Sequence, residues 1–242
     1  MKINFLTYRY HLNKESAGVP QPIVKTIPDW YKRADKFVIN SDTNKPAVDP
    51  YTGGKVPNWK SCPAVFDVMG SGYCLRTPCE LEFFYNIKGN ISVRAESEMY
   101  EDFCMPREPM DQFKVPMGYE EAHFAWWMDW GVQAPEGYSV LFTQPMNRFE
   151  LPFISTSGII DCDKVSVPGT VPFFLFKGWT GVIPAGTPYL QLIPFKRDSW
   201  QSEIHEQSYD KIFEDFRNVN KKYRVPDGGA YRNQVKEKRV YE

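Results

Sequence analysis

Cysteine and histidine, whose side chains most often bind metals or act as nucleophiles, are few in this chain and lie far apart. The residues of these two types are Cys62, Cys74, Cys79, Cys104, Cys162, His11, His123 and His205. A structural zinc site usually needs closely spaced ligand pairs, and no two of these cysteines are separated by two residues. The odd number of cysteines favours a reducing compartment in which the thiols stay free. We therefore expect no metal site of the cysteine–histidine type.

Two of these residues invite comparison with a nucleophile or a base. Cys162 lies between Asp161 and Asp163, and neighbouring carboxylates raise the pKa of a thiol because they disfavour the thiolate. His123 begins an aromatic run, and we interpret it as a satisfied polar side chain rather than a catalyst. We expect neither side chain to be reactive.

Residues 124–130 form the densest aromatic run of the chain, with tryptophans at Trp126, Trp127 and Trp130. These rings are suited to stacking on a sugar or a base, to a contact between subunits, or to core packing. Neighbouring residues of a strand point to opposite faces, so Trp126 and Trp127 cannot both face the core. We favour core packing, and the functional interpretation kept for the three tryptophans is a subunit interface.

The overall charge excludes some classes of partner. The chain has 29 basic and 30 acidic residues, a net charge of −1, and therefore lacks the positive field that non-specific nucleic-acid binding needs. No apolar run is long enough to cross a membrane, and residues 1–8 become polar too early for a secretion signal. We expect no nucleic-acid or membrane partner, and a location in the cytoplasm of a (host) cell or in a virion.

The elements that position these residues are expected to be mainly strands, because 20 prolines and 16 glycines interrupt the chain from end to end. The expected strands are residues 3–8, 64–69, 72–75, 80–87, 91–94, 123–130, 138–143, 158–161, 171–176, 181–183 and 189–194. Residues 80–87 and 91–94 should form a hairpin, and residues 40–60 a loop. The expected fold is mainly β: a distorted jelly roll or sandwich of two packed sheets.

Two helices complete the expected architecture. A short one lies near residues 28–34, where Pro28 suits the first turn. A second one spans residues 208–223, with Ser208 as the N-cap and apolar side chains every three or four residues. Its apolar side should dock on the sheet or on a partner.

The expected organisation has three parts. Residues 1–60 supply a strand, the short helix and a loop that pack on the core, and residues 61–200 form the β core. Within the core, residues 95–121 carry eight acidic side chains and several prolines, which predicts an excursion from the sheet. Residues 201–242 form the C-terminal helix and a basic tail.

Over most of its length the chain resembles an uncharacterised family of proteins from tailed phages, cyanophage-like ones among them, and from bacteria. The resemblance is carried by residues 27–32, 61–67, 137–143, 145–148, 158–161, 183–188 and 191–197. No activity is established for that family. The resemblance therefore implies a phage origin and a role such as viral structural protein or host-directed effector, without a mechanism.

Four segments also resemble, in their order and spacing, the motifs of the trimeric dUTPase and dCTP deaminase fold. They are residues 70–75, 137–148, 157–161 and 186–191. The resemblance implies that Asp161 would orient the attacking water, and that Arg148 and Gln191 would lie near the phosphates of a nucleotide. It also implies a homotrimer whose tails cross between subunits.

Other motif positions depart from that family. Cys74 stands where the first motif has an aspartate, and Met146, Asn147 and Arg148 stand where the second has an arginine and two serines. Lys164 replaces the tyrosine that would close over the base. A thiol cannot replace a carboxylate as a ligand of magnesium, and phosphoryl transfer depends on such positioned charges.

We therefore expect a non-catalytic homo-oligomeric binding or assembly protein without a cofactor, with a trimer favoured. The alternative is a magnesium-dependent deoxynucleotide hydrolase of the dUTPase type, with Asp161 as the water activator. In either case a nucleotide or small ligand would be bound by Arg148, Lys164, Gln191 and Tyr73.

Overall fold

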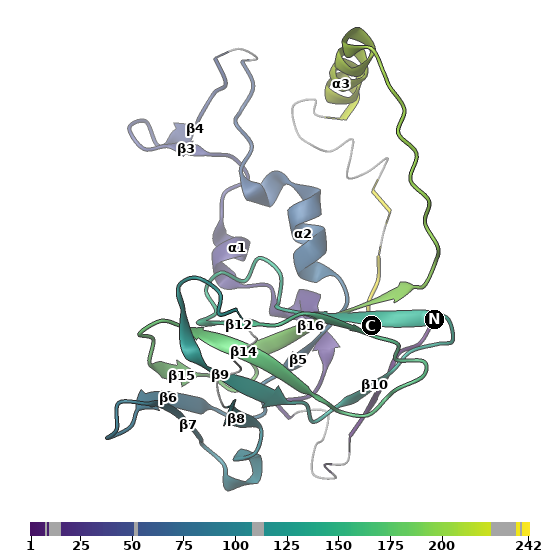
Figure 1. Cartoon of the computed structure of the whole chain (residues 1–242). Coiled ribbons are helices and arrows are strands. Elements are labelled where there is room, and N and C mark those ends of the chain that lie inside the picture. Colours follow the sequence, from purple (N-terminus) through teal and green to yellow (C-terminus); the bar gives the residue numbers. More distant parts are fainter. Residues whose placement is uncertain (8, 10–15, 51–52, 108–113, 224–235, 238) are drawn as a thin grey trace. The chain divides into compact units, whose positions relative to one another are not determined.

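The structure is a computed structural model of the chain, described here for residues 1–7, 9, 16–50, 53–107, 114–223, 236–237 and 239–242, without the side chains of residues 219–223 (Figure 1). It is mainly β, with 35% of residues in strands and 16% in helices, which confirms the expected class. The chain divides into two compact units. Unit 1 contains residues 1–26, 69–197 and 241–242, and unit 2 contains residues 27–68 and 198–240. The first 26 residues thus belong with the β core rather than with residues 27–60.

Unit 1 consists of antiparallel sheets, and every strand pair in them is antiparallel. The five-stranded sheet has the order β13 (Gly158–Ile160), β11 (Tyr138–Thr143), β16 (Pro188–Lys196), β5 (Tyr73–Arg76) and β2 (Gln21–Pro22). The four-stranded sheet has the order β12 (Phe153–Ser155), β14 (Thr170–Phe176), β9 (Tyr119–Trp127) and β8 (Cys104–Arg107).

Smaller elements complete unit 1. A three-stranded sheet has the order β15 (Gly181–Ile183), β6 (Leu81–Tyr85) and β7 (Ile91–Ala95), and β1 (Asn4–Leu6) pairs with β10 (Gly131–Gln133). The described part of unit 1 also contains the 3₁₀ turns η1 (Ile23–Thr26) and η3 (Glu98–Tyr100).

The sheets of unit 1 share one hydrophobic core. Trp126 of β9 lies at its centre and stacks on Phe173 of β14, with the ring centroids 3.7 Å apart. The Trp126 indole N–H donates to Ser155 Oγ at 2.9 Å, and that hydroxyl donates to the carbonyl of Tyr189 at 2.9 Å. This chain of hydrogen bonds satisfies the polar atom of the largest fully buried side chain and links β9, β12 and β16.

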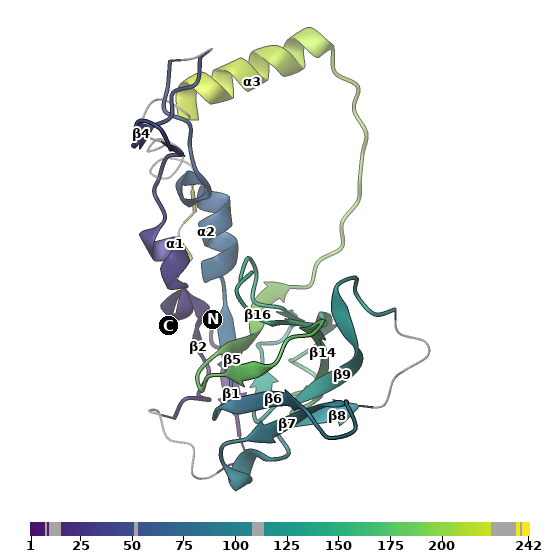
Figure 2. The same ribbon diagram turned by 90° about the vertical axis from the view of Figure 1, so that its left-hand side faces the viewer.

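Unit 2 is small and partly helical. It contains α1 (Asp29–Arg33), the strands β3 (Ile39–Asn40) and β4 (Lys45–Pro46), the 3₁₀ turn η2 (Trp59–Ser61), most of α2 (Pro63–Gly70), and α3 (Tyr209–Tyr223). Tyr31 of α1 stacks on Phe66 of α2, with the ring centroids 6.2 Å apart. Figure 2 shows α3 as one straight helix preceded by an extended segment.

Several sequence expectations are confirmed and others are corrected. The hairpin of β6 and β7 forms, and both helices form, with the Lys211 N–H donating to Ser208 Oγ at 3.3 Å as the N-cap requires. Residues 64–69 form helix α2 instead of a strand, because a short apolar run without alternation fits either element. Residues 95–121 are not a simple excursion, since they supply β8 and the start of β9; residues 108–113 lie outside the described part. Residues 40–60 include the small β3–β4 pair.

Among the described helices, none is long and apolar enough to span a membrane.

Candidate functional site

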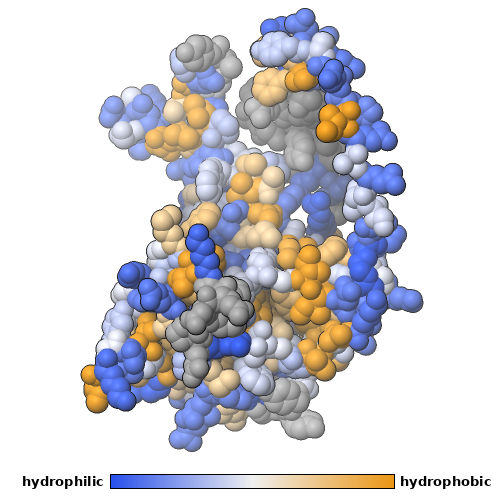
Figure 3. Space-filling view, viewed as in Figure 1, coloured by the Kyte–Doolittle hydropathy of each residue, from blue (hydrophilic) through white to orange (hydrophobic). Residues whose placement is uncertain are grey.

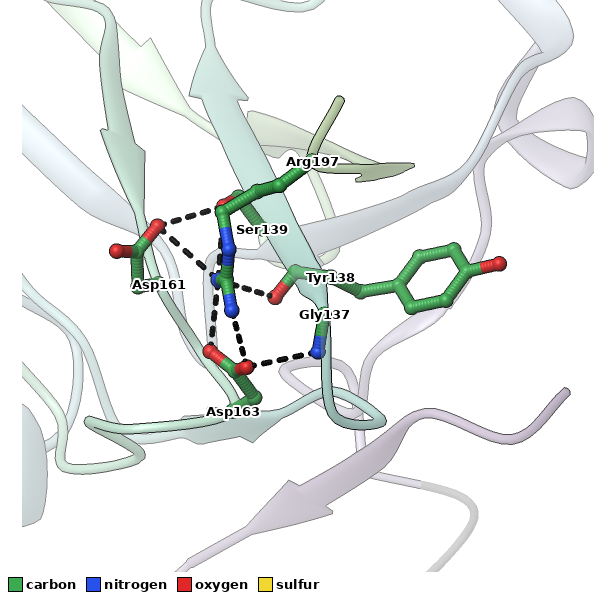
Figure 4. A network of polar contacts seen from close by, with 6 residues as sticks. All are labelled: Gly137, Tyr138, Ser139, Asp161, Asp163 and Arg197. Carbon is green, nitrogen blue, oxygen red and sulfur yellow. Dashed lines mark hydrogen bonds and ion pairs between the residues drawn. The ribbon is translucent and has the colours of Figure 1, made fainter. Parts of the chain in front are cut away.

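Charged side chains converge where β11 begins and its neighbours β13 and β16 end (Figure 4). The Arg197 guanidinium makes a two-pronged contact with the Asp163 carboxylate, in which Nη1 donates to Oδ1 at 2.8 Å and Nη2 donates to Oδ2. The same Nη1 lies 3.3 Å from Asp161 Oδ1, which also accepts a hydrogen bond from Ser139 Oγ at 2.6 Å. The Gly137 N–H donates to Asp163 Oδ2 at 2.9 Å. We call these four side chains, with the Gly137 amide, the Arg197 network.

Strand register brings the network together. Val140 of β11 pairs with Ile160 of β13, so the next residues along, Ser139 and Asp161, face each other. Tyr138 pairs with Lys196 of β16, and the Arg197 N–H continues that ladder by donating to the Gly137 carbonyl at 2.9 Å. The backbone pairing of β11 with β13 and β16 therefore places these residues side by side, although they are far apart in sequence.

Charge and hydrogen bonding set the protonation of the network. The hydrogen bonds from Arg197 hold the pKa of Asp163 well below its ordinary value, and those bonds raise the pKa of Arg197. The hydrogen bond from Ser139 lowers the pKa of Asp161, with Arg197 and Lys164 adding positive charge. The Asp163 side chain is 5% exposed, whereas that of Asp161 is 46% exposed. Both carboxylates are therefore ionised at neutral pH, and Asp161 is the one accessible to solvent.

Gln191 lies in a different part of the same sheet. It pairs with Thr143 on β11, four residues along from Ser139, which places it about 13 Å from the Arg197 network. Its side chain is 0% exposed. The amide oxygen accepts the Met146 N–H at 2.9 Å, and the amide nitrogen donates to the Ser71 carbonyl at 2.8 Å. Gln191 therefore holds two loops against the sheet.

Cys74 and Arg148 lie close to Gln191. Cys74 pairs with Gln191 across β5 and β16. Burial raises the pKa of its thiol to about 11, although the charges of Arg76 and, less strongly, Arg148 oppose the shift. Arg148 Nη1 donates to the Thr26 carbonyl at 2.9 Å, and its Nε contacts the Glu150 carboxylate. The structure thus brings together three of the positions matched to the dUTPase motifs, and protein groups occupy their polar atoms.

The surroundings of Gly72 explain why the segment of residues 70–75 needs a glycine at this position. Its φ is +81°, and an added Cβ would lie 2.0 Å from the Leu192 carbonyl oxygen. Both the backbone conformation and the close approach of β16 require a residue without a side chain. The Gly72 carbonyl in turn accepts the Ile23 N–H at 3.1 Å, which ties η1 to this turn.

Of the remaining predicted ligand-binding residues, Lys164 lies apart from Gln191, whereas Tyr73 is its neighbour in the sheet, opposite Leu192 on β16, with its side chain on the other face. Lys164 is exposed next to the Arg197 network, and its N–H donates to the Asp161 carbonyl at 2.8 Å. The Tyr73 ring contacts those of Phe5 and Tyr241, and its hydroxyl donates to the Glu242 carbonyl at 3.2 Å. The predicted residues therefore do not share one pocket. Asp161 and Lys164 lie at one end of β11, Arg148 and Gln191 lie at the other, and the Tyr73 side chain lies on the opposite face of the sheet from that of Gln191.

The tryptophans are mostly core residues. Trp126 is fully buried, and Trp130 is buried with its indole N–H donating to the Gly18 carbonyl at 3.0 Å. Because their own chain encloses these two rings, the interface interpretation of Trp126 and Trp130 is wrong. Trp127 points to the opposite face, as strand alternation predicts, and is exposed. It stays available for a subunit contact.

The surroundings of Cys162 and His123 set the protonation of these two side chains. Burial, with the charges of Asp161 and Asp163, raises the pKa of Cys162 to about 11, so its thiol stays protonated. His123 is buried against Phe174, and burial lowers its pKa. Within the described residues, no group of three histidine, cysteine, aspartate or glutamate side chains is placed to hold a metal ion.

Sequence reasoning missed Arg197, Asp163 and Ser139 as members of the site. The signal for Arg197 was a cation directly after a long apolar strand, but its partners follow only from the register of β11 with β13 and β16.

In comparisons with known proteins, no family model matches this chain and no curated protein matches it.

Proposed function

We propose that this protein is a non-catalytic, homo-oligomeric binding or assembly protein of phage origin, acting as a virion component or as a host-directed effector. The observation that carries the proposal is the position of Gln191. The residue that would meet the phosphates of a nucleotide is fully buried and hydrogen-bonded to the Met146 amide and the Ser71 carbonyl. A side chain used in this way supports the fold rather than a reaction.

The electrostatics of Asp161 support the same proposal. A general base works best when its pKa lies near the working pH, and the pKa of Asp161 is lowered by Ser139 and Arg197. The ion pair with Arg197 also sets the carboxylate against a fixed cation, 3.3 Å away. This arrangement suits a structural crosslink better than proton abstraction from water.

The finer fold assignment belongs to this proposal. Unit 1 is proposed to be a distorted jelly roll of the dUTPase type. The support is that its five-stranded and four-stranded antiparallel sheets share one core, and that β5 and β16, which contain parts of the segments 70–75 and 186–191, pair with each other. Such a fold implies a homotrimer, and the proposed place of action is the cytoplasm of the host cell or the virion.

An exposed sheet edge supports association. β13 ends the five-stranded sheet, and all three of its residues are exposed, including Ile159 and Ile160. Edge strands offer unpaired backbone groups to another chain, and apolar side chains on them favour such a contact. We assign β13 to the subunit interface on this basis.

The alternative, a magnesium-dependent deoxynucleotide hydrolase, is favoured by one observation only. Asp161 is an ionised, half-exposed carboxylate with Lys164 beside it, as a water-orienting site would need. It would lack Gln191 and Arg148, which lie at the other end of β11 and are engaged by protein groups.

Light scattering tests the oligomer. One chain has a mass of 28.1 kDa. At micromolar concentration we expect a particle whose mass is that of three chains, or of a multiple of three. A particle of one chain mass contradicts the proposal.

A further inference from the structure

Helix α3 exposes aromatic and aliphatic side chains along one side. Tyr209, Ile212 and Phe216 are 74%, 53% and 53% exposed, and Phe213 beside them is also exposed. The Tyr209 and Phe213 rings stack with their centroids 5.6 Å apart, so the apolar residues form a continuous strip. Figure 3 shows hydrophobic patches among hydrophilic ones on the surface of α3. An isolated helix of this length is marginal in water, so contacts of the strip must contribute to its stability.

The spacing of the strip is that of a coiled coil. Apolar residues occur in the sequence at 209, 212, 216, 219 and 223, with alternating steps of three and four residues. This two-heptad repeat has the a and d spacing of a seam between two helices, and Phe213 lies beside it and widens one edge of the strip. A second helix is therefore a surface that fits the strip.

The charges of α3 select the partner. Its first half carries the acids Asp210, Glu214 and Asp215 with one lysine, whereas residues 216–223 carry three basic residues and no acid. Two copies side by side in the same direction would place acid beside acid. Two copies in opposite directions place each acidic half beside a basic half, which is also the favourable arrangement of the helix dipoles.

We propose that α3 pairs antiparallel with α3 of a second copy of this chain. With residue 216 opposite residue 219 of the other copy, residue 212 lies opposite residue 223. Asp215, which flanks the seam, then lies opposite position 222, a lysine in the sequence. Each of these contacts occurs twice, because the pair has a two-fold axis.

The segment before α3 gives the helix the reach to meet another copy. Residues 198–208 contain no helix or strand and are all exposed. Eleven extended residues span up to about 36 Å. The inference deepens the proposed function, because the α3 pair joins chains, or joins two β-core trimers into a six-chain particle with three such pairs.

The test is the mass of the full-length protein by light scattering, for wild type and for the double variant Ile212→Glu/Phe216→Glu. The double variant places like charges in the seam and should halve the particle mass. A matched pair tests the charges. Asp215→Lys should weaken pairing roughly tenfold, and Glu214→Lys, the same change one residue away on the outer side, should leave it unchanged. Thermal unfolding of each variant verifies that unit 1 stays folded.

The masses separate this inference from the proposed function. Six chains falling to three in the double variant supports both, and two chains falling to one supports the α3 pair while overturning the trimer. Three chains in both proteins overturns the α3 pair alone. One chain in both overturns both proposals, as it would if α3 docked on its own chain. Equal effects of Asp215→Lys and Glu214→Lys overturn the antiparallel arrangement.

Discussion

Replacing Gln191 by leucine separates a structural glutamine from a ligand-binding one. Leucine fills a similar volume, so the main loss is the two hydrogen bonds of the buried amide, to the Met146 N–H and the Ser71 carbonyl. Leaving a buried polar group without its partner costs about 1–3 kcal/mol for each group. Both backbone partners are only partly buried and can recruit water, so we expect a total loss of about 2–4 kcal/mol in the free energy of unfolding.

Thermal unfolding followed by tryptophan fluorescence measures this loss. At about 2–4 °C per kcal/mol for a chain of this size, the Tm should fall by roughly 5–15 °C. The control is Gln133→Leu, because Gln133 is exposed and its side chain only accepts one hydrogen bond, from the Asn4 side chain, in the described structure. The Tm of this variant should change by less than about 2 °C. A Tm of Gln191→Leu equal to that of wild type would refute the structural role that we assign to this residue.

Two further predictions follow from the turn and from the ion pair. Gly72→Ala should lower the free energy of unfolding by more than about 2 kcal/mol, because the added Cβ meets the Leu192 carbonyl. The control is Gly89→Ala, which should cost only about 1 kcal/mol because Gly89 has a similar φ but open space around it. Equal losses in urea unfolding would argue against the close approach of β16 to Gly72. The pKa of Asp163 is lower in the folded protein than the ordinary 3.8, so its ionised form stabilises the fold above about pH 4, and this contribution is lost as the pH falls below that value. The Tm difference between wild type and Asp163→Asn should therefore be largest near neutral pH and shrink on acidification, and a difference independent of pH would contradict the ion pair.

Local sequence signals predicted those elements whose cause is local. The β6–β7 hairpin follows from two strand-like runs around Lys88-Gly89-Asn90, where Gly89 takes a positive φ, and α3 follows from its spacing and its Ser208 cap. Helix α2 was missed because Ala64–Met69 lacks either period. Strand β8 was missed because its surroundings are acidic and contain Pro106, which an edge strand tolerates since the proline needs no ladder hydrogen bond there.

The candidate site was predicted less well, because its contacts depend on register. The resemblance to dUTPase motifs directed attention to Asp161 and Gln191, but whether these lie together depends on how β11 pairs with β13 and β16. Four residues of strand separate them. Arg197 and Asp163 are 34 residues apart in sequence, and no local pattern predicts their two-pronged ion pair. Burial likewise determined which tryptophans could meet a partner, and strand alternation alone predicted only that Trp126 and Trp127 would differ.

The most direct test of a non-catalytic role is pyrophosphate release from a panel of deoxynucleoside triphosphates with magnesium, comparing wild type with Asp161→Asn. Asparagine keeps the shape and can still accept from Ser139, but it cannot act as a base. We predict no pyrophosphate release above background from either protein, and thermal unfolding should verify that both are folded. Release by wild type that disappears in Asp161→Asn would contradict the account and establish the hydrolase alternative.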